Sequence, residues 1–172
     1  MSDNRVCCLL AIRMHRITRL KPSQWNVLKR VRLEALRDTP DAFGSTYEEE
    51  SQYNEEEWRK RLQREDCITY VAFIEDSPIG LVVGAPYDER AGLFAMWVNS
   101  KYRGKGVGSR LVDGIIEWAR SNEYSAILLD VADNNTSALA LYIRKGFTPT
   151  GITGRLPAPR DYVKEHQRVL YL

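Results

Sequence analysis

The chain has 172 residues, of which 44% are hydrophobic and 28% charged, and its formal net charge is +2. These values are typical of one soluble globular domain, and so small a net charge favours neither nucleic acid nor a membrane surface as a partner. Three cysteines, two of them adjacent, do not form a disulfide framework. With two histidines and no C-x-x-C pair, a metal site is not expected.

The apolar run at 7–12 is short and flanked by charges, so it predicts a first strand rather than a signal peptide. No stretch approaches the length of a transmembrane helix. We therefore expect a cytoplasmic protein that works in a reducing compartment.

Hydrophobic periodicity and the turn residues predict the elements along the chain. In chain order we expect a strand at 7–17, a helix at 22–38, a loop at 39–44, a helix at 48–64, a hairpin of strands at 67–74 and 79–85, a loop containing Pro86 and Gly92, a strand at 93–98, a helix at 109–120, a strand at 126–131, a helix at 135–145 and strands at 147–153 and 164–172. This order predicts a single α/β domain over residues 1–172 with a mixed sheet.

A glycine-rich turn, Arg103-Gly104-Lys105-Gly106-Val107-Gly108, lies between the expected strand at 93–98 and the helix at 109–120. Its glycines allow a tight turn with no Cβ between the N–H groups and a ligand. The following helix N-terminus and the two cations favour an anion, most naturally a phosphate or pyrophosphate. The alternative is a tight connection with surface cations. Neither the Walker A pattern nor the dinucleotide G-x-G-x-x-G fingerprint fits the turn.

A second segment runs from Asn135 to Phe147. Asn135 is expected to cap a helix, Ala138 leaves room for close approach, and Tyr142 lies one turn further along the same face. Gly146 is expected to end the helix. Taken alone, this is also the pattern of an ordinary capped helix with a half-buried tyrosine.

Together the two segments resemble the GNAT superfamily of N-acetyltransferases, whose Arg/Gln-x-x-Gly-x-Gly/Ala motif matches Arg103-x-x-Gly106-x-Gly108. The resemblance extends to 32–36 and 40–47, which look like the family's first helix and substrate loop, to 96–98 in the central strand, and to the closing strand at 167–172. It implies a mixed, mostly antiparallel sheet of six to seven strands, about four flanking helices and a splayed central strand pair.

The resemblance implies acetyl-CoA as cosubstrate, bound where the central strands splay apart. The glycine-rich turn would hold the pyrophosphate, the backbone of Met96 and Val98 the pantetheine arm, and Asn135 and Ala138 the opposite wall. The residues expected to bind it are Met96, Trp97, Val98, Arg103, Gly104, Lys105, Gly106, Val107, Gly108, Ser109, Asn135, Ala138 and Tyr142.

The implied reaction is direct acetyl transfer to a primary amine of a small molecule or peptide in a ternary complex. By the same analogy the Val98 N–H polarises the thioester carbonyl, and Tyr142 protonates the departing thiolate. Many relatives carry a glutamate near the start of the central strand, where this chain has Ala91-Gly92-Leu93. Candidate bases are therefore Asp130, Glu89, Glu48 and Glu49, or a water chain. Cys67 has no apparent histidine partner and is not expected to act as a nucleophile.

Two alternatives to catalysis remain at this point: a non-catalytic acyl-CoA sensor of the same fold, and another nucleotide-binding α/β protein. Phe43, Tyr47 and Tyr53 are expected to line the acceptor site. The acidic helix around 48–57 is expected to be a solvated face, although it also suits a cationic acceptor such as a polyamine or aminoglycoside. Homodimers are common in the family, and its final strands often mediate them.

Overall fold

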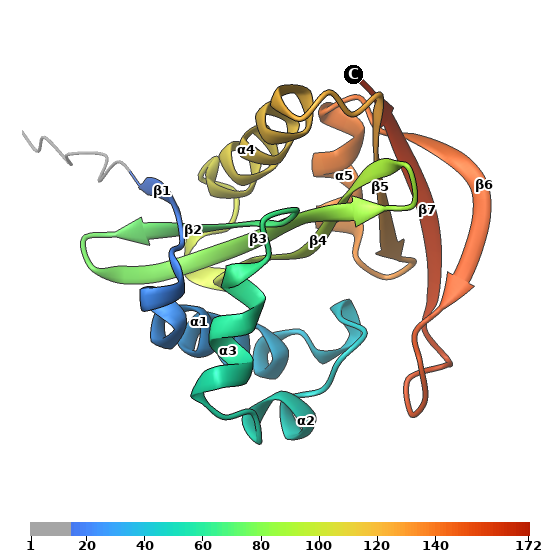
Figure 1. The fold of residues 1–172 in the computed structure, drawn as a ribbon. Helices are drawn as coiled ribbons and strands as arrows, with labels where there is room; N and C mark the ends of the chain where they lie inside the picture. Colours follow the sequence, from blue (N-terminus) through green and yellow to red (C-terminus); the bar gives the residue numbers. More distant parts are fainter. Residues whose placement is uncertain (1–14) are drawn as a thin grey trace, which may run out of the picture.

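The computed structural model describes residues 15–172, so the expected strand at 7–17 lies mostly outside the described residues. One seven-stranded sheet in the order β1-β2-β3-β4-β5-β7-β6 organises the chain (Figure 1). The strands are β1 Arg16–Arg19, β2 Ile68–Ile74, β3 Ser77–Tyr87, β4 Arg90–Val98, β5 Ala126–Ala132, β6 Thr148–Arg155 and β7 Lys164–Tyr171. Every pairing is antiparallel except that of β4 with β5, so the expected mixed, mostly antiparallel sheet is confirmed.

The helices are α1 Trp25–Asp38, α2 Tyr47–Ser51, α3 Glu55–Gln63, α4 Val107–Ser121 and α5 Thr136–Arg144, with short 3-10 turns η1 Pro22–Gln24, η2 Pro40–Ala42 and η3 Ser100–Tyr102. In Figure 1, α4 and α5 lie above the sheet, and α1, α2 and α3 lie below it. In the described residues, no helix is both long enough and apolar enough to span a membrane.

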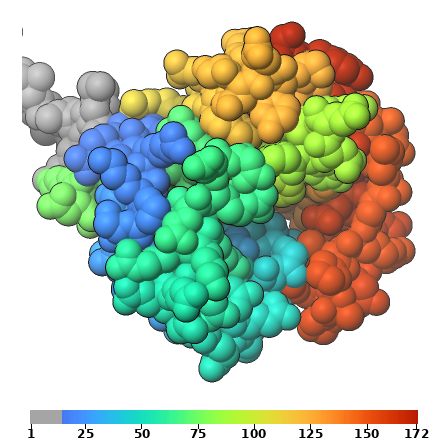
Figure 2. Space-filling view, viewed as in Figure 1, coloured from blue at the N-terminus to red at the C-terminus, as the bar shows by residue number. Residues whose placement is uncertain are grey.

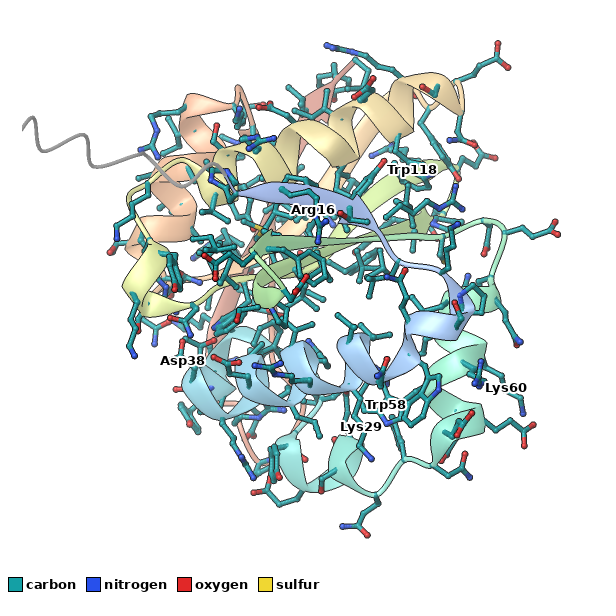
Figure 3. The ribbon with its side chains drawn as sticks, turned by 90° about the vertical axis from the view of Figure 1, so that its left-hand side faces the viewer. Arg16, Lys29, Asp38, Trp58, Lys60 and Trp118 are labelled. Carbon is teal, nitrogen blue, oxygen red and sulfur yellow. The ribbon has the colours of Figure 1, made fainter. Side chains whose placement is uncertain are left out.

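Each face of the sheet has its own core. On the upper face α4 buries the stripe of Leu111, Val112 and Ile115 against the strands. On the lower face α1 buries Val31 and Ala35. Trp58 of α3 is fully buried and points from α3 toward α1 (Figure 3). The central strands of the sheet are thus covered on both faces.

The strands part between β4 and β5. Their parallel pairing consists of two positions only, Ala91 with Ile127 and Gly92 with Leu128, at the start of each strand. From residue 93 onward β4 runs beside β5 without pairing to it, so the expected splayed central pair is confirmed. A strand edge without a partner leaves its backbone N–H and C=O groups available to a ligand.

A β-bulge bends β4 just inside this opening. Leu81 of β3 faces Trp97, but Val83 faces Phe94, so two residues of β4 stand opposite one residue of β3. The extra turn falls at Ala95, whose φ of 53° lies in the left-handed region. The bulge re-aims the last three residues of β4, which are the ones expected to meet the cosubstrate.

The helix expected at 48–64 is wrong: the structure has two helices, α2 and α3. The break occurs because each helix begins with its own capping box, Thr46 with Glu49 and Asn54 with Glu57, in which each side chain binds the other residue's backbone N–H. The loop expected to contain Pro86 and Gly92 is also wrong in extent. Pro86 lies in β3, which continues to Tyr87, Gly92 lies in β4, which begins at Arg90, and a tight turn joins the two strands.

Candidate functional site

A cleft of about 490 Å³ lies where β4 and β5 diverge, and we call it the outer cleft. Four chain segments meet in it: the loop after α1, the end of β4, the glycine-rich turn with the start of α4, and α5. Its lining residues are Thr39, Pro40, Asp41, Ala42, Met96, Trp97, Val98, Arg103, Gly104, Gly106, Gly108, Ser109, Asn134, Asn135, Ser137, Ala138, Leu141 and Arg144. Ten of the thirteen residues expected to bind acetyl-CoA are among them.

The glycines of the turn serve two different purposes. Gly104 and Gly106 have φ values of +71° and +81°, which glycine adopts without the strain of a Cβ. Gly106 is the N-cap of α4, so the free N–H groups of the first helical turn follow it directly. Gly108 is small for another reason: a Cβ there would lie 3.0 Å from Met96 Cε and 3.1 Å from Leu141 Cδ2. Together they produce a helix N-terminus open to an anion.

The two cations of the turn do not aim freely at the outer cleft. Arg103 donates from Nε to the Val98 carbonyl at 2.7 Å and from Nη2 to Asp38 Oδ2 at 2.6 Å. Lys105 is exposed, does not line the outer cleft, and donates to the Lys101 carbonyl at 2.9 Å. The attraction for an anion at this turn therefore comes mainly from backbone N–H groups and the helix dipole.

Asp38 joins α1 to the end of β4. Besides Arg103, it accepts a hydrogen bond from Trp97 Nε1 at 2.9 Å. One turn earlier on α1, Glu34 accepts a bond from Asn99 Nδ2 at 2.7 Å. In Figure 3, Asp38 lies at the end of α1 below the turn that follows β4. The Trp97 ring nitrogen is thus held toward α1.

The Val98 backbone faces the opening. The N–H of the next residue, Asn99, donates to the Ile79 carbonyl on the β3 side at 2.8 Å. Because successive backbone groups in a strand point to opposite edges, the N–H and C=O of Val98 point toward β5. Arg103 occupies that C=O, which leaves the N–H as the free donor. Met96, two residues earlier, has the same orientation.

The wall formed by α5 begins at Asn135, whose Oδ1 accepts the Ala138 N–H at 3.2 Å and caps the helix as expected. Ala138 and Leu141 lie on the cleft face of α5. The sequence prediction missed Ser137 and Arg144 on this wall, although Ser137, Leu141 and Arg144 follow a helical spacing that could have revealed them.

A second hollow of about 240 Å³, which we call the inner chamber, adjoins the outer cleft and shares with it the wall residues Ala42, Met96, Asn135 and Ala138. Its other lining residues are Arg32, Phe43, Gly44, Leu93, Phe94, Ala95, Asp130, Val131, Ala132, Tyr142, Leu156, Pro157 and Glu165. Together the two hollows traverse the gap between β4 and β5.

Tyr142 lies in the wall of the inner chamber, one helical turn after Ala138. Its ring is 4% exposed and packs edge-on against Phe147, with centroids 5.7 Å apart. Burial raises the pKa of Tyr142 well above its usual range. The phenol therefore stays protonated at neutral pH, and it makes no hydrogen bond with any described residue that would compete with a ligand.

Two carboxylates line the inner chamber on the β5–β7 side. Asp130 of β5 lies opposite Gln167 of β7, and Glu165 lies opposite Ala132, so both acids are on one face of the sheet. Burial raises the pKa of Asp130, and burial together with the Asp130 charge raises the pKa of Glu165. Raised carboxyl pKa values in a cavity are typical of sites that accept protons. Glu165 was missed from sequence because it lies in a charged strand near the end of the chain.

The other candidate residues fall elsewhere. Of the predicted acceptor-lining aromatics, Phe43 lines the inner chamber, whereas Tyr47 and Tyr53 line neither hollow. The three remaining base candidates, Glu89, Glu48 and Glu49, also line neither hollow.

Val107 is buried in the upper core rather than exposed in the outer cleft. The Cys67 thiol has its pKa raised to about 11 by burial, which disfavours a thiolate nucleophile.

The acidic run at 48–57 is not uniformly solvated as expected. Glu50 is fully buried, because Arg32 and Arg61 reach it from two sides. Arg32 donates from Nη2 at 2.8 Å, and Arg61 from Nη1 at 2.9 Å. No residue of 48–57 lines either hollow.

Comparison with known proteins agrees with this arrangement. The family model described as acetyltransferase (GNAT) family matches residues 32–147. Human N-acetyltransferase 8 is 35% identical over 95 residues, which are 52% of this chain and 41% of that protein. The chain thus spans under half the length of this relative.

Among solved structures, an acetyltransferase of GNAT family from Streptococcus pneumoniae has a TM-score of 0.76 at 21% identity, covering 92% of this chain and 100% of the other. The ribosomal L7/L12 α-N-protein acetyltransferase RimL, solved with coenzyme A, has a TM-score of 0.73 at 16% identity, covering 92% and 94%. At sequence identities of 21% and 16%, these two structural similarities show a shared fold and nothing more. The family match covers well over half of the chain, and it includes the glycine-rich turn, the splayed strands and all of α5. The chain therefore belongs to the GNAT family of acetyltransferases.

Proposed function

We propose that this protein is an N-acetyltransferase that moves an acetyl group from acetyl-CoA to a primary amine by direct transfer in a ternary complex. The observation that carries the proposal is the pair of adjoining hollows, with shared wall residues, at the β4–β5 gap. A helix N-terminus and an unpaired strand edge at the outer cleft support binding of a phosphorylated, strand-like ligand, and Tyr142, Asp130 and Glu165 in the inner chamber support proton transfer. Acetyl-CoA supplies a thioester, an activated acyl group that an amine can attack.

The outer cleft suits acetyl-CoA at three places. The α4 N-terminus after Gly106 offers N–H groups to the pyrophosphate. The unpaired edge of β4 at Met96 and Val98 offers backbone groups to the pantetheine arm, which has amides of its own. Arg144 adds a cation at the α5 end of the outer cleft. RimL, a fold neighbour of this chain, was solved with coenzyme A.

Val98 would stabilise the negative charge that develops on the thioester oxygen during transfer. The Val98 N–H points into the gap. Arg103 holds the end of β4 in place by its hydrogen bond to the Val98 carbonyl. A donor fixed before the reaction does not have to reorganise when charge develops, which is the main source of electrostatic catalysis.

Tyr142 would give its proton to the sulfur that leaves. Burial raises the pKa of Tyr142 and keeps its phenol neutral, and its position in the wall of the inner chamber supports this role. A positioned acid of this kind contributes roughly 10²–10⁴-fold to the rate.

Asp130 is the candidate base that the geometry favours, with Glu165 beside it. An alkylamine has a pKa of roughly 10 and must lose a proton before it attacks. Asp130 lines the inner chamber and its raised pKa makes it a better proton acceptor than an ordinary carboxylate. The two acids also supply negative charge that attracts the ammonium form of the acceptor.

An acceptor screen tests the proposal. Thiol release from acetyl-CoA would be followed with amino acids, peptides, polyamines and aminoglycosides, and each product would be identified by mass spectrometry. We expect amine-dependent release with at least one class and an acetylated amine as product. The second candidate, an acyl-CoA sensor, is favoured by the missing glutamate at the start of β4. It predicts acetyl-CoA binding with no turnover on any amine.

A further inference from the structure

Arg160, in the loop between β6 and β7, is an arginine with an unusual set of partners. Its side chain is buried, with 6% exposure for the residue. Nη1 donates to the carbonyls of Pro40 at 2.5 Å, Phe43 at 2.6 Å and Ser45 at 3.3 Å, and Nη2 donates to the Gly44 carbonyl at 3.0 Å. One guanidinium thus binds four carbonyls of a single six-residue stretch, which we call the 40–45 segment.

These contacts give the 40–45 segment side-chain partners for carbonyls that lack backbone ones. Among the described residues, the carbonyls of Phe43, Gly44 and Ser45 accept no backbone hydrogen bond. No described carboxylate lies within ion-pair distance of Arg160. Among the described residues, carbonyl dipoles therefore balance the buried charge of Arg160. Hydrogen bonds from a charged donor are stronger than those from a neutral one, so these contacts hold the segment firmly. The forked guanidinium can reach several oxygens in one plane, which the point charge of lysine cannot.

The 40–45 segment is one of the walls common to both hollows. Pro40, Asp41 and Ala42 line the outer cleft, and Ala42, Phe43 and Gly44 line the inner chamber. The loop that carries Arg160 also contributes Leu156 and Pro157 to the inner chamber. Figure 2 shows this orange loop pressed against the light-blue segment. A shift of the 40–45 segment would change the shape of the inner chamber directly.

A second arginine holds the side chain of the same wall. Arg32 Cζ lies 4.6 Å from the centroid of the Phe43 ring, and Glu50 fixes Arg32 in turn. The Phe43 ring is thus held by Arg32 and its carbonyl by Arg160. Two independent attachments to one wall residue indicate that the position of this wall matters to the site.

We propose that Arg160 is a positioning residue that sets the affinity and selectivity for the acceptor amine, by holding the 40–45 segment as the wall of the inner chamber. The inference rests on the proposed function, and Arg160 itself touches none of the expected reacting groups. When these hydrogen bonds are lost, the 40–45 segment can move and the inner chamber widens. Acceptor amines then bind more weakly, and the enzyme distinguishes less well between them.

The test compares Arg160→Lys and Arg160→Met with Arg155→Met. Arg155 is a matched control, because it is the last residue of β6 just before the same connection, is exposed and, among the described residues, donates a hydrogen bond only to the Asp161 carbonyl. For the best acceptor in the screen, we expect both Arg160 variants to raise KM about tenfold or more, with kcat and the acetyl-CoA Kd changed less than about threefold. Amide hydrogen exchange at 41–46 should accelerate in the same variants. Arg155→Met should match the wild type in every measurement.

Tyr162→Phe provides a variant that is safe for folding. Tyr162 is 65% exposed, and its hydroxyl donates to Asp41 Oδ1 at 3.0 Å, between the same two loops. We expect its removal to raise the acceptor KM about two- to threefold.

If the wild type acetylates an amine and the Arg160 variants have an unchanged acceptor KM, the inference is overturned while the proposed function stands. If the Arg160 variants do not fold, an unchanged acceptor KM in Tyr162→Phe overturns the inference instead. A wild-type protein that acetylates no amine overturns the proposed function, and the inference falls with it.

Discussion

Arg103 donates a hydrogen bond from Nε to the carbonyl of Val98 at 2.7 Å, so the first residue of the glycine-rich turn is bound to the last residue of β4. Asp38 completes the arrangement by pairing with the other side of the guanidinium at 2.6 Å. The motif arginine thus orients the strand whose free N–H we expect to meet the thioester oxygen.

This contact predicts that Arg103→Ala lowers kcat more than it weakens acetyl-CoA binding. The Val98 peptide loses its anchor, and a misplaced oxyanion donor costs roughly tenfold or more in rate. Lys105→Ala is the matched control in the same turn and should retain kcat. Steady-state kinetics together with calorimetric acetyl-CoA titrations separate the two effects. A large loss of affinity with normal kcat in Arg103→Ala would instead assign Arg103 to direct anion binding.

The Tyr142→Phe variant should bind acetyl-CoA normally and transfer slowly. Removing one hydroxyl leaves the Phe147 contact and the α5 wall intact, while the acid is lost, so kcat should fall roughly 10²-fold or more. Because burial raises the pKa of Tyr142, the wild-type rate should show no loss from its ionisation below pH 9. The pH profile of kcat in both proteins measures this, and an unchanged kcat in the variant would remove Tyr142 as the acid.

Asp130→Asn should separate activity from stability. As a base, Asp130 must be ionised, so wild-type kcat/KM should rise with pH through a carboxyl pKa that lies above the ordinary value, and the variant should lose that limb along with roughly tenfold or more of the rate.

The same raised pKa means that the folded protein binds protons more tightly at this site than the unfolded chain does, so ionised Asp130 weakens folding above that pKa. Urea unfolding at pH 7 should find Asp130→Asn at least as stable as the wild type. A less active and clearly less stable variant would indicate a structural role.

Glu50 should contribute strongly to stability. Burial alone would raise the pKa of Glu50, but hydrogen bonds and charges from Arg32 and Arg61 outweigh it and hold the pKa below its usual range. Breaking a buried ion pair by removing one partner costs roughly 3–5 kcal/mol, and we expect that loss of unfolding free energy in Glu50→Gln at pH 7.

The sign of its pH dependence follows from the lowered pKa: the stabilisation is complete above the ordinary carboxyl value and is lost as the pH falls through the lower, folded-state pKa. Urea unfolding between pH 6 and pH 3 should therefore show a steeper loss for the wild type than for Glu50→Gln. The exposed neighbour Glu48→Gln should follow the wild type, and a Glu50→Gln curve that also follows it would contradict the buried network.

Gly108→Val should weaken acetyl-CoA binding without unfolding the protein. A side chain at this position would push Met96 and Leu141, which both line the outer cleft. We expect a Kd for acetyl-CoA raised about tenfold or more, by calorimetric titration. Gly154→Val on the edge strand β6, where a Cβ would meet nothing within 4 Å, is the control and should bind normally. Equal affinity in both variants would place acetyl-CoA elsewhere.

The sequence was sufficient for the elements that local rules determine. The periodicity of α4, the Asn135 cap and the glycine turn all lie in contiguous stretches, and the family resemblance supplied the splayed strands. The break between α2 and α3 could have been read from the capping pair of Asn54 and Glu57, but the continuous charge pattern concealed it.

Other features depend on contacts between distant segments. Arg160 and its carbonyl partners are separated by at least 115 residues along the chain. The local sequence predicts a surface position for Glu50, and only the folded structure shows that Arg32 pairs with it in the interior. Periodicity describes which face a residue occupies, and it carries no information about which distant segment covers that face. The resemblance pointed to 40–47 as a substrate loop, but the attachment of the 40–45 segment by Arg160 and the position of Glu165 in the inner chamber could be found only in the folded chain.

The initial-velocity pattern for acetyl-CoA and the acceptor amine tests the central claim most directly. Direct transfer across the β4–β5 gap requires both substrates to be bound together. We therefore expect double-reciprocal lines that intersect, and a protein mass that is unchanged after incubation with acetyl-CoA alone. Parallel lines together with an acetylated protein would show a covalent intermediate, and they would contradict the account.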